Sequence, residues 1–281
     1  MNTIKTFLLM ALLTILFVLI GGWVGGRNGM IIALIFAGMI NFISYFYSDK
    51  IVLKMYRAQP LTEAEAPESY RIVDNLRRQA GLPMPRIAII PKQAPNAFAT
   101  GRNPKNAVVA VTQGLLNLTN REELEGVLAH ELAHIKHRDM LIGTVAATLA
   151  GAIIILARIA GYSALFFGSR RRDSGLGTLF LAILAPIGAM LIHMAISRQR
   201  EYAADREGGE ISRKPEKLAS ALRKLEEYSR RIPMEVNPST AHMFIVNPLK
   251  GGGLVNLFRT HPTTQDRIKK LLDQARKIGR I

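Results

Sequence analysis

A short stretch of the chain carries the residue types of a metal-dependent hydrolase. It reads HELAH, so His130 and His134 are four positions apart. If this stretch is helical, the two side chains lie one turn apart on the same face, and both imidazoles can reach one Zn²⁺ ion. Glu131 lies beside that face, where its carboxylate can act as a general base toward the attacking water. We therefore predict that His130 and His134 bind zinc and that Glu131 is catalytic.

A catalytic zinc site needs a third protein ligand and an open position. His137 shares the helix face, but Met140 stands where the H-x-x-G-x-x-H continuation would have its third histidine. The chain has no cysteine, so any metal ligand must be His, Asp or Glu. Further along, REYAAD offers Glu201 with Asp205 one turn later. This resembles the gluzincins, in which a downstream helical Glu completes the zinc site and an Asp one turn later orients a ligand histidine.

Four long runs without charged residues alternate with the polar stretches. They span residues 7–26, 29–48, 141–157 and 176–196. A helix needs about 20 apolar residues to cross the hydrocarbon core of a bilayer, with about 17 as a lower limit. We therefore expect four membrane-embedded helices. A cleaved signal peptide is the alternative for the first run, but the second run follows at once, which favours a retained helical hairpin.

The net charge of +16 also points to a membrane surface. Lys5, Lys50, Lys54 and Arg57 flank the first two runs, whereas Arg27 alone lies between them. By the positive-inside rule, the flanking segments face the cytoplasm. The basic excess is then expected beside anionic lipid. No nucleic-acid-binding motif or aromatic-basic pattern is present, so we expect no nucleic-acid partner.

The polar stretches have the periodicity of a water-soluble domain with helices and a small β-sheet. A capping box of Thr119 and Glu122 is expected to open the helix that carries the HELAH motif, and this helix is expected to continue into the third apolar run. Short strands are expected at 86–90 and 107–112, with a third between them. Helices are expected at 67–80, from 121 through 137 and beyond, from the fourth run to about 208, at 215–231 and at 264–278.

The apolar runs predict how distant site residues meet. The histidine pair lies just before the third run, and Glu201 lies five residues after the fourth. If these runs form a hairpin, both helix extensions leave the membrane side by side. We therefore expect an N-terminal hairpin at 1–48 and a protease domain at 49–281, which a second hairpin at 141–196 interrupts.

The order of these features resembles the HtpX family of membrane-bound zinc endopeptidases, which are relatives of the eukaryotic CAAX prenyl proteases. The matching features are two N-terminal runs, HELAHIKHRDM, two more runs, SRQREYAAD and RTHPTTQDRI, and they cover nearly the whole chain. The resemblance implies a mostly α-helical fold with a small β-sheet, in which a gluzincin-like zinc protease domain is fused to four membrane-embedded helices. It also implies one Zn²⁺ per chain, held by His130, His134 and Glu201, with Glu131 as the base and Asp205 behind a ligand histidine.

The same resemblance implies a location and a function. The protein is expected to be a multi-pass protein of the cell inner membrane, with its active site facing the cytoplasm. Its expected partners are the lipid bilayer and membrane-protein substrates, because the family acts in quality control of damaged or misassembled membrane proteins. Two other functions compete with this one: an intramembrane protease of the site-2 type, which also uses H-E-x-x-H, and a non-catalytic membrane scaffold. Charged residues flank the motif and no apolar run contains Asp, which disfavours the first, and an intact Glu131 disfavours the second.

Further candidates concern the substrate and the oxyanion. The stretch NAFATG could be an edge strand along which substrate backbone pairs, and the residues concerned are Asn96, Ala97, Phe98 and Ala99. An ordinary edge strand is the alternative.

His261, in the THP stretch, could donate a hydrogen bond to the oxyanion, with Arg267 and Tyr202 as rivals. His261 could equally be a histidine that precedes a helix. We expect His193, in the fourth run, to be a packed histidine, and His137 and His242 to be surface residues.

Overall fold

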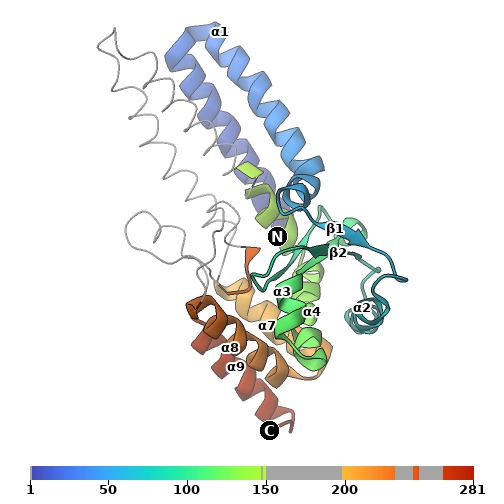
Figure 1. Ribbon diagram of the computed structural model, residues 1–281. Coiled ribbons are helices and arrows are strands. Elements are labelled where there is room, and N and C mark those ends of the chain that lie inside the picture. Colours follow the sequence, from blue (N-terminus) through green and yellow to red (C-terminus); the bar gives the residue numbers. More distant parts are fainter. Residues whose placement is uncertain (1, 147, 150–197, 232–242, 247–261) are drawn as a thin grey trace.

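The computed structural model describes residues 2–146, 148–149, 198–231, 243–246 and 262–281 (Figure 1). Most of the third apolar run and all of the fourth lie outside the described residues, as do His193, His242 and His261. The second membrane hairpin therefore stays a prediction.

The N-terminal 54 residues form one long kinked helix, α1 (Asn2–Met55). The helix folds back on itself at Gly25 and Gly26, where Gly26 adopts a φ of 57° that only glycine reaches without strain. Figure 1 shows the result as two antiparallel arms. In the described part of the chain, Gly25–Tyr47 is the one helix long and apolar enough to cross a membrane, and Thr6–Leu19 is a shorter apolar helix. The two arms form a helical hairpin, and its crossing of the membrane stays a prediction.

A four-stranded sheet forms one layer of the soluble part, with strand order β1-β2-β4-β3. The central strands β2 and β4 run parallel, and β1 and β3 pair antiparallel with them at the two edges. All five β4 residues are buried, as expected for a β-branched central strand. The strands predicted at 86–90 and 107–112 are confirmed. The four strands are β1 (Gln59–Leu61), β2 (Arg86–Ile90), β3 (Ala97–Thr100) and β4 (Val108–Thr112).

Helices pack around a central helix, α4 (Arg121–Lys136), which contacts α2, α7, α8 and strand β3. Their shared core includes Val127, Leu128 and Leu132 of α4 with Leu218 and Leu222 of α8. The predicted helices at 67–80, 215–231 and 264–278 are confirmed to within one residue. The remaining helices are α2 (Pro67–Ala80), α3 (Gln113–Leu118), α7 (Arg198–Ser212), α8 (Pro215–Arg231) and α9 (Thr264–Lys277), with a short 3₁₀ turn η1 (Pro104–Asn106).

The N-terminus of α4 differs from the prediction. The capping box pairs Asn120 with Glu123, not Thr119 with Glu122. The reason is that Thr119 belongs to the preceding helix, where its backbone N–H and its hydroxyl both donate to the Leu115 carbonyl. Because Thr119 satisfies the end of α3, the next residue is free to begin α4.

The C-terminus of α4 also corrects the prediction of a continuous helix into the third run. The helix ends at Lys136, and Arg138 adopts a left-handed φ of 58°. Helical structure resumes at Asp139. The restarted helix packs Leu141, Ile142 and Val145 against Leu9 and Leu13 of α1. The break therefore lies between the soluble core and the apolar hairpin.

Candidate active site

The structure brings His130, His134 and Glu201 together. Each residue has one potential ligand atom that lies within 4.8 Å of those of the other two. The two Nε2 atoms are 3.2 Å apart, and Glu201 Oε1 and Oε2 lie 3.6 Å from His134 Nε2 and 3.9 Å from His130 Nε2, respectively. Helix α4 supplies the histidines, and α7 packs against it to supply the carboxylate. The sequence separation of 67 residues between His134 and Glu201 is closed by this helix pair.

A carboxylate holds the far side of each histidine. His130 Nδ1 lies 3.0 Å from Asp205 Oδ1, and His134 Nδ1 donates a hydrogen bond of 3.1 Å to Asp139 Oδ2. A proton held on Nδ1 leaves Nε2 as the free lone pair, which is the form in which histidine binds a metal. Both Nε2 atoms lie within 4 Å of a Glu201 carboxylate oxygen. This largely buried set of two nitrogens and one carboxylate fits a metal ion.

A buried arginine in turn holds Asp205. Arg267, from α9, is 1% exposed and donates two parallel hydrogen bonds to Asp205, of 2.8 and 2.7 Å. Its Nη1 donates to the Ile245 carbonyl at 2.6 Å and lies 3.6 Å from Glu201 Oε2. Burial alone would raise the pKa of Asp205, but the Arg267 charge and hydrogen bonds outweigh burial and lower it. Asp205 thus stays ionised, with its Oδ1 3.0 Å from His130 Nδ1.

Glu131 is buried beside the group but is not part of it. Glu131 is 4% exposed, and the Ala99 backbone N–H donates a hydrogen bond to its carboxylate. Burial raises the pKa of Glu131 to about 7, and the nearby Glu201 charge adds to this effect. A carboxyl group with this pKa can both accept and release a proton near neutral pH, as a general acid–base group must.

The two histidines differ in their electrostatic surroundings. Burial lowers the pKa of His130, which favours its neutral form. Burial acts in the same direction on His134, but the Asp139 hydrogen bond and the charges of Glu201 and Glu131 outweigh it and raise the pKa to about 9. A metal that binds His134 must therefore displace a proton.

Close packing of α7 on α4 depends on Gly208. A Cβ atom at this position would lie 2.9 Å from the backbone Cα and N of His130. We predicted that this helix ends near Gly208, but α7 continues to Ser212. Gly208 is a contact point inside the helix and not a stop. The contact places the Glu201 helix against the backbone of a predicted ligand.

The comparisons with known proteins agree with this arrangement. Residues 63–275 match peptidase family M48. The chain belongs to peptidase family M48. It is 59% identical over 275 residues to a "Protease HtpX homolog" of Desulforapulum autotrophicum, covering 96% of this chain and 89% of the relative. It is 56% identical to a "Protease HtpX homolog" of Persephonella marina, with 100% of both chains covered. The resemblance to the HtpX family is thus confirmed.

A solved structure shares the fold. The crystal structure of S. mikatae Ste24p aligns with a TM-score of 0.51 at 16% identity, covering 96% of this chain. The chain spans 65% of the length of that structure's chain. Together with the family match, these comparisons show an M48 metalloprotease with a mostly helical fold and a small mixed sheet. The apolar α1 hairpin agrees with a membrane protease.

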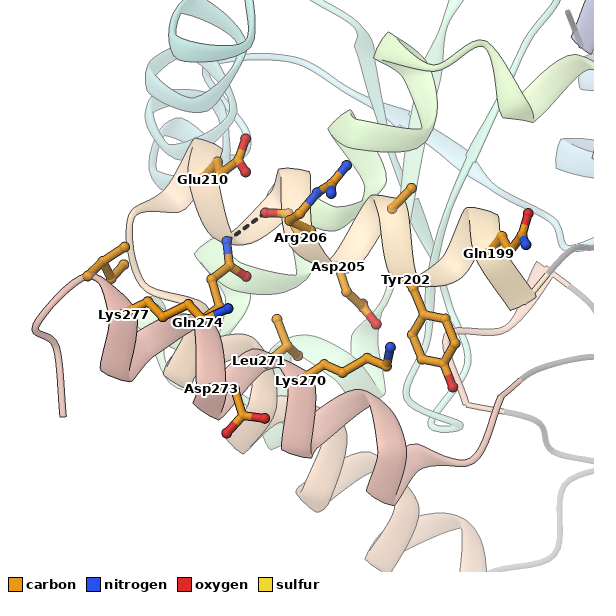
Figure 2. Close-up of a pocket in the computed structure, with 12 residues that line it drawn as sticks. Gln199, Tyr202, Asp205, Arg206, Glu210, Lys270, Leu271, Asp273, Gln274 and Lys277 are labelled. Atoms are coloured by element: carbon orange, nitrogen blue, oxygen red, sulfur yellow. Dashed lines mark hydrogen bonds between the residues drawn. The ribbon is translucent and has the colours of Figure 1, made fainter.

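Two predicted oxyanion donors of this M48 protease can be placed. The Arg267 guanidinium is already engaged with Asp205 and the Ile245 carbonyl. Tyr202 lines a cavity of about 650 Å³ between α7 and α9, where Lys270 Nζ lies 4.2 Å from the centre of its ring (Figure 2). Neither His130, His134 nor Glu131 lines this cavity. His261 lies outside the described residues and stays a prediction.

The predicted substrate strand lies at the edge of the sheet. Among the described strands, β3 pairs with β4 alone, so one side of its backbone has no strand neighbour. The side chains of Asn96, Ala97, Phe98 and Ala99 are buried. Asn96 Oδ1 accepts a hydrogen bond from the Ile245 backbone, and the Ala99 backbone contacts Glu131. The edge strand thus borders the proposed catalytic base.

Sequence reasoning missed one residue of the site and misread another. The sequence suggests only a charge beside the motif for Asp139 and only an oxyanion donor for Arg267. In the structure, Asp139 accepts a hydrogen bond from His134, and Arg267 donates hydrogen bonds to Asp205. His137, the local alternative for the third ligand, lies 3.7 Å from Glu207 and is outside the metal group. Its side chain is 30% exposed.

Proposed function

We propose that the protein is a membrane-anchored, zinc-dependent endopeptidase that cleaves misfolded or damaged membrane proteins at the cytoplasmic membrane face. The observation that carries the proposal is the buried His130, His134 and Glu201 group, with Glu131 beside it, at the base of an apolar hairpin. The membership in family M48 supports the peptidase activity.

His130, His134 and Glu201 would hold one zinc ion, because two imidazoles and one carboxylate form a common catalytic ligand set. Bound there, zinc supplies a Lewis acid that polarises a peptide carbonyl and lowers the pKa of water. Glu131 accepts the proton of the attacking water and returns it to the leaving amine. Its pKa of about 7 suits both transfers. Asp205 and Asp139 hold the two imidazoles so that each Nε2 faces the group.

The side of β3 that has no strand neighbour among the described residues would position the substrate. An extended peptide that adds to this edge forms backbone hydrogen bonds regardless of its side chains. Because Ala99 contacts Glu131, such a peptide passes close to the base. Backbone recognition suits an enzyme that removes unfolded segments, since an unfolded segment offers a free backbone and no fixed shape.

The position of α4 favours membrane-protein substrates and disfavours intramembrane cleavage of the site-2 type. Leu141, Ile142 and Val145 pack on Leu9 and Leu13 of α1, so the site lies about one to two helical turns from the apolar hairpin. In contrast, α4 itself packs within the soluble core, and its first turn forms ion pairs between Glu122 and both Lys214 and Lys217. A helix immersed in lipid would not expose such charges.

Two measurements test the proposal. The protein purified in detergent should contain about one zinc per chain, and it should cleave an unfolded membrane-protein substrate in a way that a chelator stops and added zinc restores. A soluble unfolded protein serves as the comparison substrate. Cleavage that persists after full metal removal would contradict the zinc mechanism, and metal binding without any cleavage would favour the scaffold function.

A further inference from the structure

Asp139 occupies the same relation to His134 as Asp205 does to His130. Each carboxylate oxygen lies about 3 Å from an Nδ1 atom: 3.1 Å for Asp139 and 3.0 Å for Asp205. Asp139 is only 8% exposed, so the carboxylate, and not bulk water, is the partner of the His134 ring. The arrangement is unexpected from the sequence, because Asp139 follows His134 by five positions.

A continuous helix could not make this contact. Five residues at 100° each turn through about 140° beyond one full revolution, so the two side chains would lie on different faces. The break after Lys136 changes this geometry. Arg138, with a φ of 58°, redirects the chain before helical structure resumes at Asp139. The Asp139 side chain is thereby turned back onto His134.

The turn is held at a conformational cost. A non-glycine residue in the left-handed region is strained, and such strain persists where surrounding contacts determine the backbone. The contacts here are the Arg138 N–H to the Ile135 carbonyl, at 3.1 Å, and the Asp139 carboxylate to His134. Arg138 itself is exposed, so its side chain packs little.

We infer that Asp139 is a positioning residue for the metal, which holds the His134 ring with Nε2 toward Glu201, and that the left-handed turn at Arg138 exists to deliver it. This inference rests on the proposed zinc site. The two ligand histidines are then oriented by acids of different origin: Asp205 comes from α7, and Asp139 comes from the same chain segment as the ligand. The charge of Arg200 on α7 also interacts electrostatically with Asp139.

The test compares Asp139→Ala, Asp139→Asn and Arg138→Gly with the wild-type protein in detergent. Zinc affinity is measured by competition with a chelator of known affinity, and melting temperatures are measured with and without zinc. Loss of such an outer partner typically weakens metal binding 10- to 100-fold. We expect Asp139→Ala to show this loss. Asp139→Asn, whose amide oxygen still accepts from Nδ1, should show a smaller one.

Arg138→Gly is the matched control, because glycine adopts the same φ without strain. It should keep wild-type zinc affinity and raise the melting temperature or leave it unchanged. The melting data separate positioning from general packing. A positioning role shrinks the gap between the zinc-loaded and metal-free melting temperatures, whereas a packing role lowers both equally.

The outcomes distinguish this inference from the proposed function. A wild-type protein that binds no zinc would defeat the proposed function itself. If wild type binds zinc and Asp139→Ala binds it equally well, the positioning role is wrong. If Asp139→Ala does not fold, Asp139→Asn decides: weaker zinc binding with an unchanged metal-free melting temperature supports the inference, and unchanged binding overturns it.

Discussion

At the scale of single residues, two buried glutamates near one predicted metal are assigned different work. Glu201 belongs to the three-residue group, whereas Glu131 lies outside it and contacts the backbone of β3. Their chemistry follows from these neighbours. A carboxylate among imidazole lone pairs serves as a ligand, and a carboxyl group whose pKa is raised to about 7 by burial serves as a proton carrier.

Substitution should separate the two roles. Glu131→Gln preserves shape and leaves the ligands intact, so it should retain about one zinc per chain while cleavage falls roughly 10²- to 10⁴-fold, the usual loss of a general base. Glu201→Ala should lose both zinc and activity. Elemental analysis beside a cleavage assay measures both, and Glu210→Ala, an exposed acid on the same helix, is the control. An active Glu131→Gln protein would refute its role as base, and a fully metallated Glu201→Ala protein would place the third ligand elsewhere.

At the scale of elements, the site depends on how closely α7 lies against α4. The two helices meet at Gly208, opposite the backbone of His130. The neighbouring Gly209 faces only the flexible end of the Gln274 side chain. Two adjacent glycines in one helix therefore have different reasons to be there, which a sequence pattern does not reveal.

This contrast predicts opposite effects of the same substitution. Gly208→Ala forces the helices apart and should destabilise the protein by about 1 to 3 kcal/mol, as overpacking does, with weaker zinc binding because His130 moves. Gly209→Ala gains helix propensity, worth up to about 1 kcal/mol, and the Gln274 side chain can move aside. Melting temperature and zinc affinity of both variants test this. Equal behaviour of the two variants would show that the α4–α7 contact tolerates a methyl group.

The start of α4 carries a second element-scale device. Glu123 is 3% exposed and accepts hydrogen bonds from the Asn120 backbone, Ser220 Oγ and Lys224 Nζ, of 3.0, 2.7 and 2.7 Å, respectively. Burial by itself would raise the pKa of Glu123, but these bonds outweigh it and lower the pKa. The carboxylate thus joins the cap of α4 to α8.

The lowered pKa of Glu123 predicts the direction of a pH effect. A group whose pKa is depressed by folding adds stability above its unfolded pKa of about 4.3, and this stability is lost as pH falls through the folded value. Glu123→Gln should therefore be less stable than wild type by about 1.5 to 3 kcal/mol at neutral pH, and the difference should shrink below about pH 4. Unfolding curves from pH 3 to 7 test this. A difference that does not change with pH would exclude the ionised carboxylate as its source.

At the scale of the whole molecule, two junctions join the soluble core to the apolar hairpin. Val52 and Tyr56, at the end of α1, pack with Phe98 and Phe244 on one side of the sheet. At the second junction, Leu141, Ile142 and Val145, which follow α4, pack on the first arm of α1. Both junctions lie at the same end of the hairpin (Figure 1), so the proposed site and the sheet are held beneath it.

This architecture and the distribution of Lys and Arg predict the topology. Arg223, exposed on α8, should lie in the cytoplasm, and Arg27, exposed at the bend of α1, should lie on the opposite side. The chain has no cysteine, so Arg223→Cys and Arg27→Cys each introduce one unique thiol. In a bacterial host, a membrane-impermeant maleimide should label Arg27→Cys in intact cells and Arg223→Cys only after the membrane is opened. The reverse pattern would invert the orientation.

Local patterns were sufficient for much of the fold. The helix at 67–80 was predicted to the residue because Pro67 opens it and Gly81 ends it in the left-handed conformation. The strand at 86–90 was predicted from its β-branched residues. The errors lie at two helix boundaries. The capping pattern assigns Thr119 to the start of α4, although Thr119 ends α3, and the sequence predicts a helix through Arg138, where neither glycine nor proline marks the turn.

The sequence by itself determined the part of the site that lies within one helical turn. The spacing of His130, Glu131 and His134 places them on neighbouring faces of any α-helix, and the uncharged runs identify the apolar hairpin. The REYAAD stretch and the family resemblance also indicated Glu201 and Asp205, but the tertiary structure decided which contacts these residues make. The contacts of Glu201, Asp139 and Arg267 with these histidines and with Asp205 depend on helix packing and on a left-handed turn. Periodicity reports which residues share a face of one element, whereas packing determines which faces meet.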